Sequence, residues 1–311
     1  MNKPVLFFLL LFFTTSCVKV TDTIQPKVSL QVEKDHIQNL ASAFTPLSEE
    51  EIPQDWAKEY KIGLCFAQDF DLYRAISTFK RSAVLLEDAP DRKQELSYFM
   101  LYCYYLGERY FDAIATFERS NLMHVDLSFE PHHDLLLVLL KSYLEVGNEE
   151  KAEKIQRLLQ KHYPKTHEDV EISLALQTGD LPKLSHLSKK KPYLQSLIHG
   201  YEAEKKSVFK AQTYNALFPG MGYLYLGQRK TAVTTFLFNS LFIYSSYYFF
   251  REGNIAAGAI FSFFEFGWYV GSIYGAGESA KYYNERMYEK QARTIAEEYK
   301  HAPTFMLRYG F

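Results

Sequence analysis

The sequence predicts an all-α protein in which a helical-repeat solenoid is followed by a two-helix transmembrane hairpin. Three segments in the first two thirds share one pattern at nearly constant spacing, which is typical of stacked helix pairs. Tyr and Phe then concentrate between residues 214 and 288, around two stretches with almost no charge. We expect five regions: a signal peptide with a lipobox-like end over 1–17, a tether over 18–49, helical repeats over 50–210, a membrane hairpin domain over 211–290 and a C-terminal tail over 291–311.

The first residues have the layout of an export signal. Lys3 precedes an unbroken apolar run over 5–13, which is too short to span a bilayer but fits the apolar core of a signal peptide. Small residues then lead to Cys17, which resembles a bacterial lipobox, although Thr14 stands where that motif usually has Leu. The resemblance implies lipidation of Cys17. A cleaved signal with an incidental cysteine and an uncleaved anchor are the alternatives.

The repeated segments align on three alanines. Ala75, Ala113 and Ala152 are separated by 38 and 39 residues, and each follows an apolar helical stretch and a turn-like point. Small residues at such positions let two antiparallel helices approach closely, while neighbouring aromatic side chains fill the gap beside them. A fourth, weaker unit is expected over 169–187, where Gly179 marks a turn.

This pattern resembles the tetratricopeptide repeat family. The matching positions are Gly63, Phe66, Ala75 and Phe79 in the first unit, Tyr104, Tyr110, Ala113 and Phe117 in the second, and Tyr143, Gly147, Ala152 and Pro164 in the third. The family's Trp is absent and the spacing exceeds its usual length, so the loops between repeats must be longer. The resemblance implies a curved surface that binds protein partners. A generic helical bundle is the alternative.

Two further cysteines occupy equivalent positions in neighbouring repeats. Equivalent sites on stacked helices lie roughly 10 Å apart, whereas a disulfide needs Cα atoms within about 7 Å. We therefore expect Cys65 and Cys103 to be buried free thiols.

Two apolar stretches predict the transmembrane hairpin. Residues 231–250 carry no charge, and as a helix they would be about 30 Å long. Residues 255–276 carry only Glu265, and four residues with a glycine separate the two stretches. Tyrosines lie near both ends, where an aromatic belt belongs. A helix pair buried in a soluble core is the alternative.

The segment before the first stretch contains a Pro-Gly-x-Gly-x-x-Tyr-x-Gly pattern. Its residues are Pro219, Gly220, Gly222, Tyr225 and Gly227. This pattern resembles the signature of small bacterial membrane-hairpin domains, whose function is mostly unknown. It is expected to stop an incoming helix at the membrane surface, because Pro cannot continue a helix and glycines permit sharp turns. An ordinary Pro-Gly loop is the alternative.

The second stretch carries a glycine ridge and an acidic residue. Gly267, Gly271 and Gly275 recur every four residues, which predicts close packing against the first helix or against another copy. Glu265 within a membrane is expected to face protein or water, and Asn239 is a candidate hydrogen-bond partner. A proton or ion pathway is the functional interpretation of Glu265, and a protonated, hydrogen-bonded side chain is the structural one.

Two signals disagree about the orientation of the hairpin. An export signal would place the repeats outside the cytoplasm, whereas basic residues crowd the open end of the hairpin and Arg251 is the basic residue of its turn. We give the export signal more weight, which implies periplasmic repeats.

The net charge of −2 gives no indication of nucleic-acid binding, and no catalytic motif, metal site or cofactor site is evident. The sequence therefore favours a non-enzymatic, membrane-anchored adaptor or assembly protein of the bacterial envelope, similar to lipoproteins of outer-membrane assembly. It is expected to bind protein partners and membrane lipid. The alternative is a membrane-embedded transport or channel component that uses Glu265 and the glycine ridge.

Overall fold

The computed structural model describes residues 20–28, 34–87 and 89–311. These residues form helices and, within the described ranges, no strands, so the all-α prediction is confirmed. The signal peptide and Cys17 lie outside the described residues. The chain divides into two units, which are described separately below. Unit 1 comprises residues 1–28 and 178–292, and unit 2 comprises residues 29–177 and 293–311.

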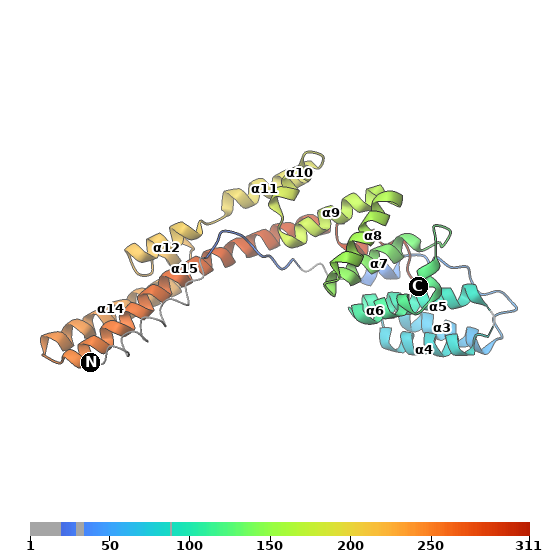
Figure 1. Ribbon diagram of the computed structural model, residues 1–311, viewed down its shortest axis with the longest axis horizontal. Helices are drawn as coiled ribbons and strands as arrows, with labels where there is room; N and C mark the ends of the chain where they lie inside the picture. The colour runs from blue at the N-terminus through green and yellow to red at the C-terminus, as the bar shows by residue number, and fades with distance from the viewer. Residues whose placement is uncertain (1–19, 29–33, 88) are drawn as a thin grey trace. The chain divides into compact units, whose positions relative to one another are not determined.

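Unit 2 is a succession of helices, and between residues 55 and 162 each α-helix packs against the next (Figure 1). Its helices are α2 (Lys34–Gln38), α3 (Asp55–Gln68), α4 (Leu72–Leu85), α5 (Pro90–Leu106), α6 (Tyr110–Glu118), η1 (Asn121–His124), α7 (His132–Glu145), α8 (Glu149–His162), the body of α9 (Pro164–Thr178) and η2 (Pro303–Met306). The three predicted repeats fall on the pairs α3–α4, α5–α6 and α7–α8.

One backbone turn recurs inside all three helix pairs. The left-handed residue of the turn is Phe70, Glu108 or Gly147, with φ of 59°, 57° and 73°. These positions are 38 and 39 residues apart, the same spacing as the alanines. In each turn the next residue donates its N–H to a carbonyl five residues earlier, which closes the end of the first helix. The same turn geometry therefore recurs at the spacing of the three alanines.

The predicted alanines lie where helices touch. Ala75 and Ala113 are 0% exposed and Ala152 is 2% exposed. Gly63 serves the same purpose in α3, since a β-carbon there would lie 2.6 Å from the ring of Phe79 in α4. Among the other matched residues, Tyr104 and Tyr143 are buried, Phe66 and Phe117 pack partly buried against the core, Tyr110 begins α6 and Pro164 begins α9.

Both cysteines are free thiols, as expected, but only one is buried. Cys103 is 0% exposed in α5, whereas Cys65 is exposed in α3. Burial raises the pKa of the Cys103 thiol. The prediction of burial was wrong for Cys65, because equivalent positions on stacked helices need not face equivalent neighbours.

Segments on both sides of the repeats also belong to the core of unit 2. Ile37 of the predicted tether is 0% exposed, and the ring of Phe44 packs edge-on against Tyr98 and Phe99. In the predicted tail, Leu307 and Phe311 are 3% and 8% exposed. Parts of the predicted tether and of the predicted C-terminal tail therefore pack into the core of unit 2.

Unit 1 contains the predicted hairpin. Its helices are α10 (Leu181–Ser188), α11 (Pro192–Glu204), α12 (Val208–Leu217), α13 (Met221–Tyr225), α14 (Arg229–Arg251) and most of α15 (Ile255–Glu298). Helices α14 and α15 lie side by side (Figure 1). The ring of Phe249 is stacked on that of Phe261, and the ring centroids of Phe238 and Trp268 are 5.2 Å apart. Within the part of the chain that the structure describes, no helix is long and apolar enough to cross a membrane. Tyr, Ser, Thr and Asn side chains lower the mean hydropathy of α14.

The Pro-Gly motif makes two close reversals at the base of the hairpin. Helix α12 ends before Pro219, and Gly220 adopts a φ of 94° that L side chains rarely reach. A β-carbon at Gly220 would collide with the carbonyl oxygen of Ala232 in α14, and one at Gly222 would collide with that of Ala211 in α12. The motif thus brings three helices into backbone contact.

Candidate functional site

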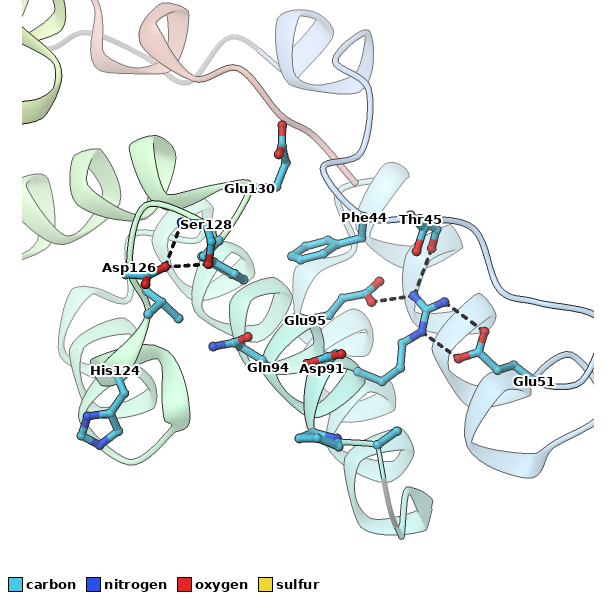
Figure 2. Close-up of a pocket in the computed structure, with 15 residues that line it drawn as sticks. Phe44, Thr45, Glu51, Asp91, Gln94, Glu95, His124, Asp126, Ser128 and Glu130 are labelled. Atoms are coloured by element: carbon cyan, nitrogen blue, oxygen red, sulfur yellow. Dashed lines mark hydrogen bonds and ion pairs between the residues drawn. The ribbon is translucent and has the colours of Figure 1, made fainter.

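A pocket of about 720 Å³ lies beside the start of α5 in unit 2 (Figure 2). Acidic side chains dominate its charged lining, which consists of Glu51, Asp91, Arg92, Glu95, His124, Asp126 and Glu130. Pro90 at the first turn of α5 fixes where that helix begins, so Asp91, Arg92, Gln94 and Glu95 line the pocket from a rigid element.

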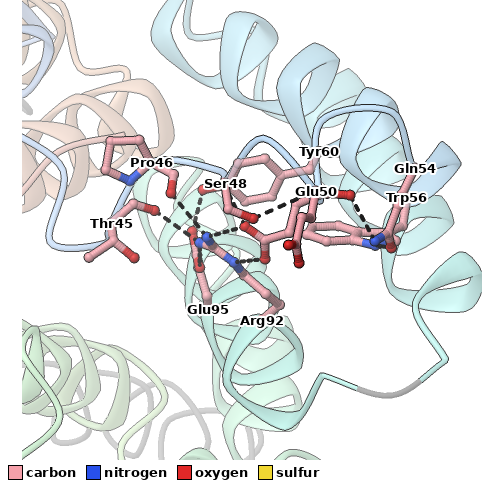
Figure 3. A network of polar contacts seen from close by, with 10 residues as sticks. Thr45, Pro46, Ser48, Glu50, Gln54, Trp56, Tyr60, Arg92 and Glu95 are labelled. Atoms are coloured by element: carbon pink, nitrogen blue, oxygen red, sulfur yellow. Dashed lines mark hydrogen bonds and ion pairs between the residues drawn. The ribbon is translucent and has the colours of Figure 1, made fainter.

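Arg92 is the centre of a polar network at one side of the pocket (Figure 3). Its guanidinium donates to both carboxylate oxygens of Glu51 at 2.9 and 3.0 Å and to Glu95 at 2.7 Å. The carbonyl oxygens of Thr45 and Pro46 accept the remaining two hydrogen bonds, at 3.0 and 3.2 Å. All five N–H donors of the arginine are therefore satisfied, and residues 45–51 are fixed against α5.

The two carboxylates of this network differ in electrostatic state. Hydrogen bonding to Arg92 lowers the pKa of Glu51 to about 2. Glu95 is only 3% exposed and accepts the hydroxyl of Tyr60, and its burial raises its pKa despite these bonds. Glu51 is thus the permanent counter-ion of Arg92, while Glu95 is the group whose charge is costly to bury.

The other polar side chains of the pocket differ in whether they already have partners. Asp126 accepts hydrogen bonds from the N–H and the hydroxyl of Ser128, and Glu130 accepts the hydroxyl of Tyr309. Asp91, Gln94 and His124 have no hydrogen-bond partner within the described ranges and face the pocket (Figure 2). An open pocket with acidic and amide groups is suited to binding a cationic or amide-bearing group.

The hairpin of unit 1 has an inverted distribution of side chains. The buried residues of α14 are small or polar and follow a heptad spacing: Ala232, Thr235, Asn239 and Ser246. The large side chains point outward, each at least 38% exposed: Val233, Phe236, Leu237, Phe238, Leu241, Ile243, Tyr244, Tyr247, Tyr248 and Phe250 in α14, and Ile255, Ile260, Phe263, Phe264, Phe266, Trp268, Val270 and Tyr274 in α15. A helix pair folded for water would bury these side chains.

Polar atoms between α14 and α15 lack partners. Asn239 is 1% exposed, its amide nitrogen donates to the Thr235 carbonyl at 2.7 Å, and its side-chain oxygen accepts no hydrogen bond. One carboxylate oxygen of Glu265 and the hydroxyl of Ser246 are also buried without a partner. The expected bond between Glu265 and Asn239 is therefore not formed.

The glycine ridge does not hold the two helices together. A β-carbon added at Gly267 or Gly271 would meet no atom within 4 Å, and only Gly275 faces a neighbour, the hydroxyl of Tyr223. The expected contact with the first hairpin helix is thus wrong for all three glycines, because Tyr223 belongs to α13, whereas packing against another copy stays a prediction. Gly267 and Gly271 instead line an open groove of about 570 Å³ that also contains Lys230 and Thr235.

Sequence reasoning missed the residues that fasten the base of the hairpin. Asn215 is 0% exposed, accepts the N–H of Gly220 at 2.9 Å and donates to the hydroxyl of Ser272 at 3.0 Å. Tyr225 of the motif accepts the Ser207 N–H at 3.2 Å. A buried amide shortly before a Pro-Gly turn was the available signal, but it is a weak one.

Comparison with protein-family models, with curated proteins and with solved structures found no match for this chain.

Proposed function

We propose that the protein is a membrane-anchored adaptor of the bacterial envelope, in which the C-terminal hairpin enters lipid and the tetratricopeptide-like helix pairs bind a protein partner. Lipidation at Cys17 would add a second anchor and place the repeats in the periplasm. Two anchoring signals together hold a protein on a membrane more firmly than one.

The inverted hairpin carries this proposal. Contiguous exposed apolar patches above a few hundred Å² are rare on monomeric soluble proteins. In lipid, by contrast, large apolar side chains belong outside, and small or polar ones belong between helices. The buried Ala232, Thr235 and Asn239 and the exposed Leu237, Phe263 and Phe264 follow this second rule. Basic residues at Arg229 and Lys230 fit the headgroup level at the open end.

Exposed aromatic residues at repeated positions support the adaptor role. Tyr73 at the start of α4 is 75% exposed, and Phe111 at the start of α6 is 76% exposed. They are 38 residues apart, so they occupy the same position in two consecutive repeats. Aromatic side chains are enriched in the centres of protein interfaces.

Flotation with liposomes tests the anchor. The full chain should carry Cys17→Ser, so that an attached lipid cannot cause binding. We expect the protein to float with phospholipid vesicles and to resist alkaline extraction, and the double substitution Leu237→Lys with Phe264→Lys to abolish both. Val84→Lys, at a position 84% exposed in unit 2, is the matched control and should float normally. A chain that stays in solution without detergent and does not float contradicts the proposal.

Site-specific photo-crosslinking in cells tests the adaptor role. A photoreactive residue at Phe111 should yield a discrete crosslinked protein, and the same residue at the exposed Arg119, beyond the end of α6, should not. Identical crosslinking patterns from both positions would contradict a partner surface on the aromatic side.

A second candidate function is a component of a transport or channel complex. The unpartnered atoms of Asn239, Ser246 and Glu265 favour it, because polar groups without partners inside a membrane hairpin are suited to contacting water or an ion. Reconstituted full chain should then conduct protons or cations, and Glu265→Gln should reduce the flux, whereas the exposed Glu278→Gln should not. Equal flux from protein-free vesicles would eliminate this candidate.

A further inference from the structure

Residues Leu307–Phe311, here called the strap, lie in unit 2 as an extended segment held by its main chain. The N–H groups of Arg308 and Tyr309 donate to one carboxylate oxygen of Asp134, at 2.8 and 2.9 Å. The Tyr309 carbonyl accepts the Tyr102 hydroxyl at 3.2 Å. Gly310 donates to the Ala41 carbonyl at 2.9 Å, and the Phe311 carbonyl accepts the side-chain amide of Gln68 at 3.5 Å.

Asp134 is buried and held in position for this contact. It is 0% exposed in the first turn of α7, and its other carboxylate oxygen is 2.7 Å from Nδ1 of His133. His133 is in turn 2.9 Å from the Thr166 hydroxyl, which fixes the imidazole ring. The N–H groups of Arg308 and Tyr309 are the donors to the Asp134 oxygen that faces the strap, so expelling the strap removes both of them. A segment that replaces the strap must therefore supply backbone N–H groups to restore this contact.

The side chains of the strap meet a selective surface. Phe311 packs against Phe99 and Tyr102, with ring centroids 5.8 and 5.2 Å apart. A β-carbon at Gly310 would lie 2.7 Å from the Ile37 carbonyl oxygen and 2.9 Å from that of Leu40, so only glycine fits there. Arg308 is exposed, and besides its backbone N–H it contributes a guanidinium group 5.6 Å from the centroid of the Tyr163 ring.

Peptide recognition commonly uses the main chain and the side chains of the bound segment for different purposes. Main-chain hydrogen bonds supply affinity for an extended segment, and pockets for alternate side chains supply specificity. We infer that the strap groove is a peptide-binding site for extended segments of the pattern Leu-x-Tyr-Gly-Phe, and that the chain's own strap occupies it until a partner's segment of the same pattern displaces it. The inference rests on the proposed adaptor role and identifies the surface of unit 2 that grips the partner.

Because the chain's own strap occupies the groove, a partner's segment must compete with it. The apparent affinity for an external segment falls in proportion to the fraction of molecules whose groove is open. A peptide offered to the intact chain should therefore bind weakly, and any change that expels the strap should strengthen binding.

The test uses a fluorescent peptide of residues 303–311 and the full chain. Gly310→Ala in the chain should expel the strap by collision with the two carbonyl groups, and the peptide should then bind at least about tenfold more tightly than to the unmodified chain. Arg308→Ala is the matched control and should bind no more peptide than the unmodified chain. A peptide that itself carries Ala in place of Gly310 should not bind the open groove, and adding Asp134→Ala should abolish binding of the normal peptide.

A second measurement avoids a substitution in the strap. A protease site inserted after the exposed Lys300 allows the chain to be cut in its folded state. The nicked protein should exchange its own segment for the labelled peptide. No exchange, or unfolding upon cutting, would overturn the inference and make the strap a fixed part of the core. Liposome flotation would still test the membrane anchor, so failure of one proposal is distinguishable from failure of the other.

Discussion

Replacing Glu51 by Gln should destabilise unit 2 at neutral pH and have little effect in acid. Glu51 makes two parallel hydrogen bonds with Arg92 and accepts the Ser48 N–H at 2.7 Å. Because its pKa in the folded state, about 2, lies below the ordinary value of 4.5, its contribution is present above pH 4.5. That contribution is lost as the pH falls toward 2.

The size of the effect follows from the same values. Lowering a pKa from 4.5 to about 2 corresponds to roughly 3 kcal/mol of free energy of unfolding. Solvent screening reduces this figure, because the Glu51 side chain is 23% exposed while that of Arg92 is 12% exposed. We therefore expect Glu51→Gln to cost about 1–3 kcal/mol at pH 7.

Glu95→Gln should behave in the opposite way. Burial raises the pKa of Glu95 in the folded state, so ionisation of this group weakens the fold as the pH rises. A neutral amide keeps an acceptor for Arg92 and a partner for Tyr60 while removing the charge. The substitution should be neutral or stabilising at pH 7.

Fluorescence of Trp56 provides the assay. The chain has two tryptophans, so Trp268→Phe leaves Trp56 as the reporter, 6.3 Å from the ring of Tyr60. Urea unfolding of the full chain in detergent, at pH 7, 4.5 and 3, would give the free energy of each variant. If Glu51→Gln and Glu95→Gln lose equal stability at pH 7, or if the cost of Glu51→Gln grows in acid, the assignment of charges in the network is wrong.

Three further predictions test the turns and the hairpin, with urea unfolding as the measurement for the first two. Glu108→Gly should stabilise unit 2 by about 1 kcal/mol, because glycine adopts the left-handed backbone of this position without strain. Gly147→Ala should destabilise unit 2 by a similar amount for the same reason. Effects of the same sign would contradict the repeated turn. Gly220→Ala should be far more damaging than Gly227→Ala, because only the first collides with backbone, although both have positive φ. Gly271→Leu should leave cysteine crosslinking between α14 and α15 unchanged, and a loss of crosslinking would restore the ridge as their contact.

The parts of the fold that could be predicted from the sequence are those that depend on residues close together in the chain. The buried Ala75, Ala113 and Ala152 were predictable, because small residues at a fixed spacing mark close helix contacts. The turns followed from the same spacing, even where Phe70 and Glu108 take the place of the usual glycine.

Contacts between distant segments were not predictable. Asp134 accepts hydrogen bonds from backbone N–H groups 174 and 175 residues away, and backbone groups carry no sequence signal. The Arg92 network likewise depends on how residues 45–51 return to α5. The spacing of Gly267 and Gly271 correctly places them on one face, but spacing does not tell what lies opposite that face.

The hairpin of unit 1 and the core of unit 2 follow opposite burial rules, and this contrast bears on the environment of each. Large side chains such as Tyr98, Phe99 and Leu101 are fully buried in unit 2, as expected for a core formed in water. In the hairpin, Thr235 and Asn239 are buried while rings and aliphatic chains face outward. Intrinsic helix propensity does not explain the difference, because it does not distinguish one helix face from another. We therefore expect the hairpin to need an apolar surrounding, and liposome flotation tests whether lipid supplies it.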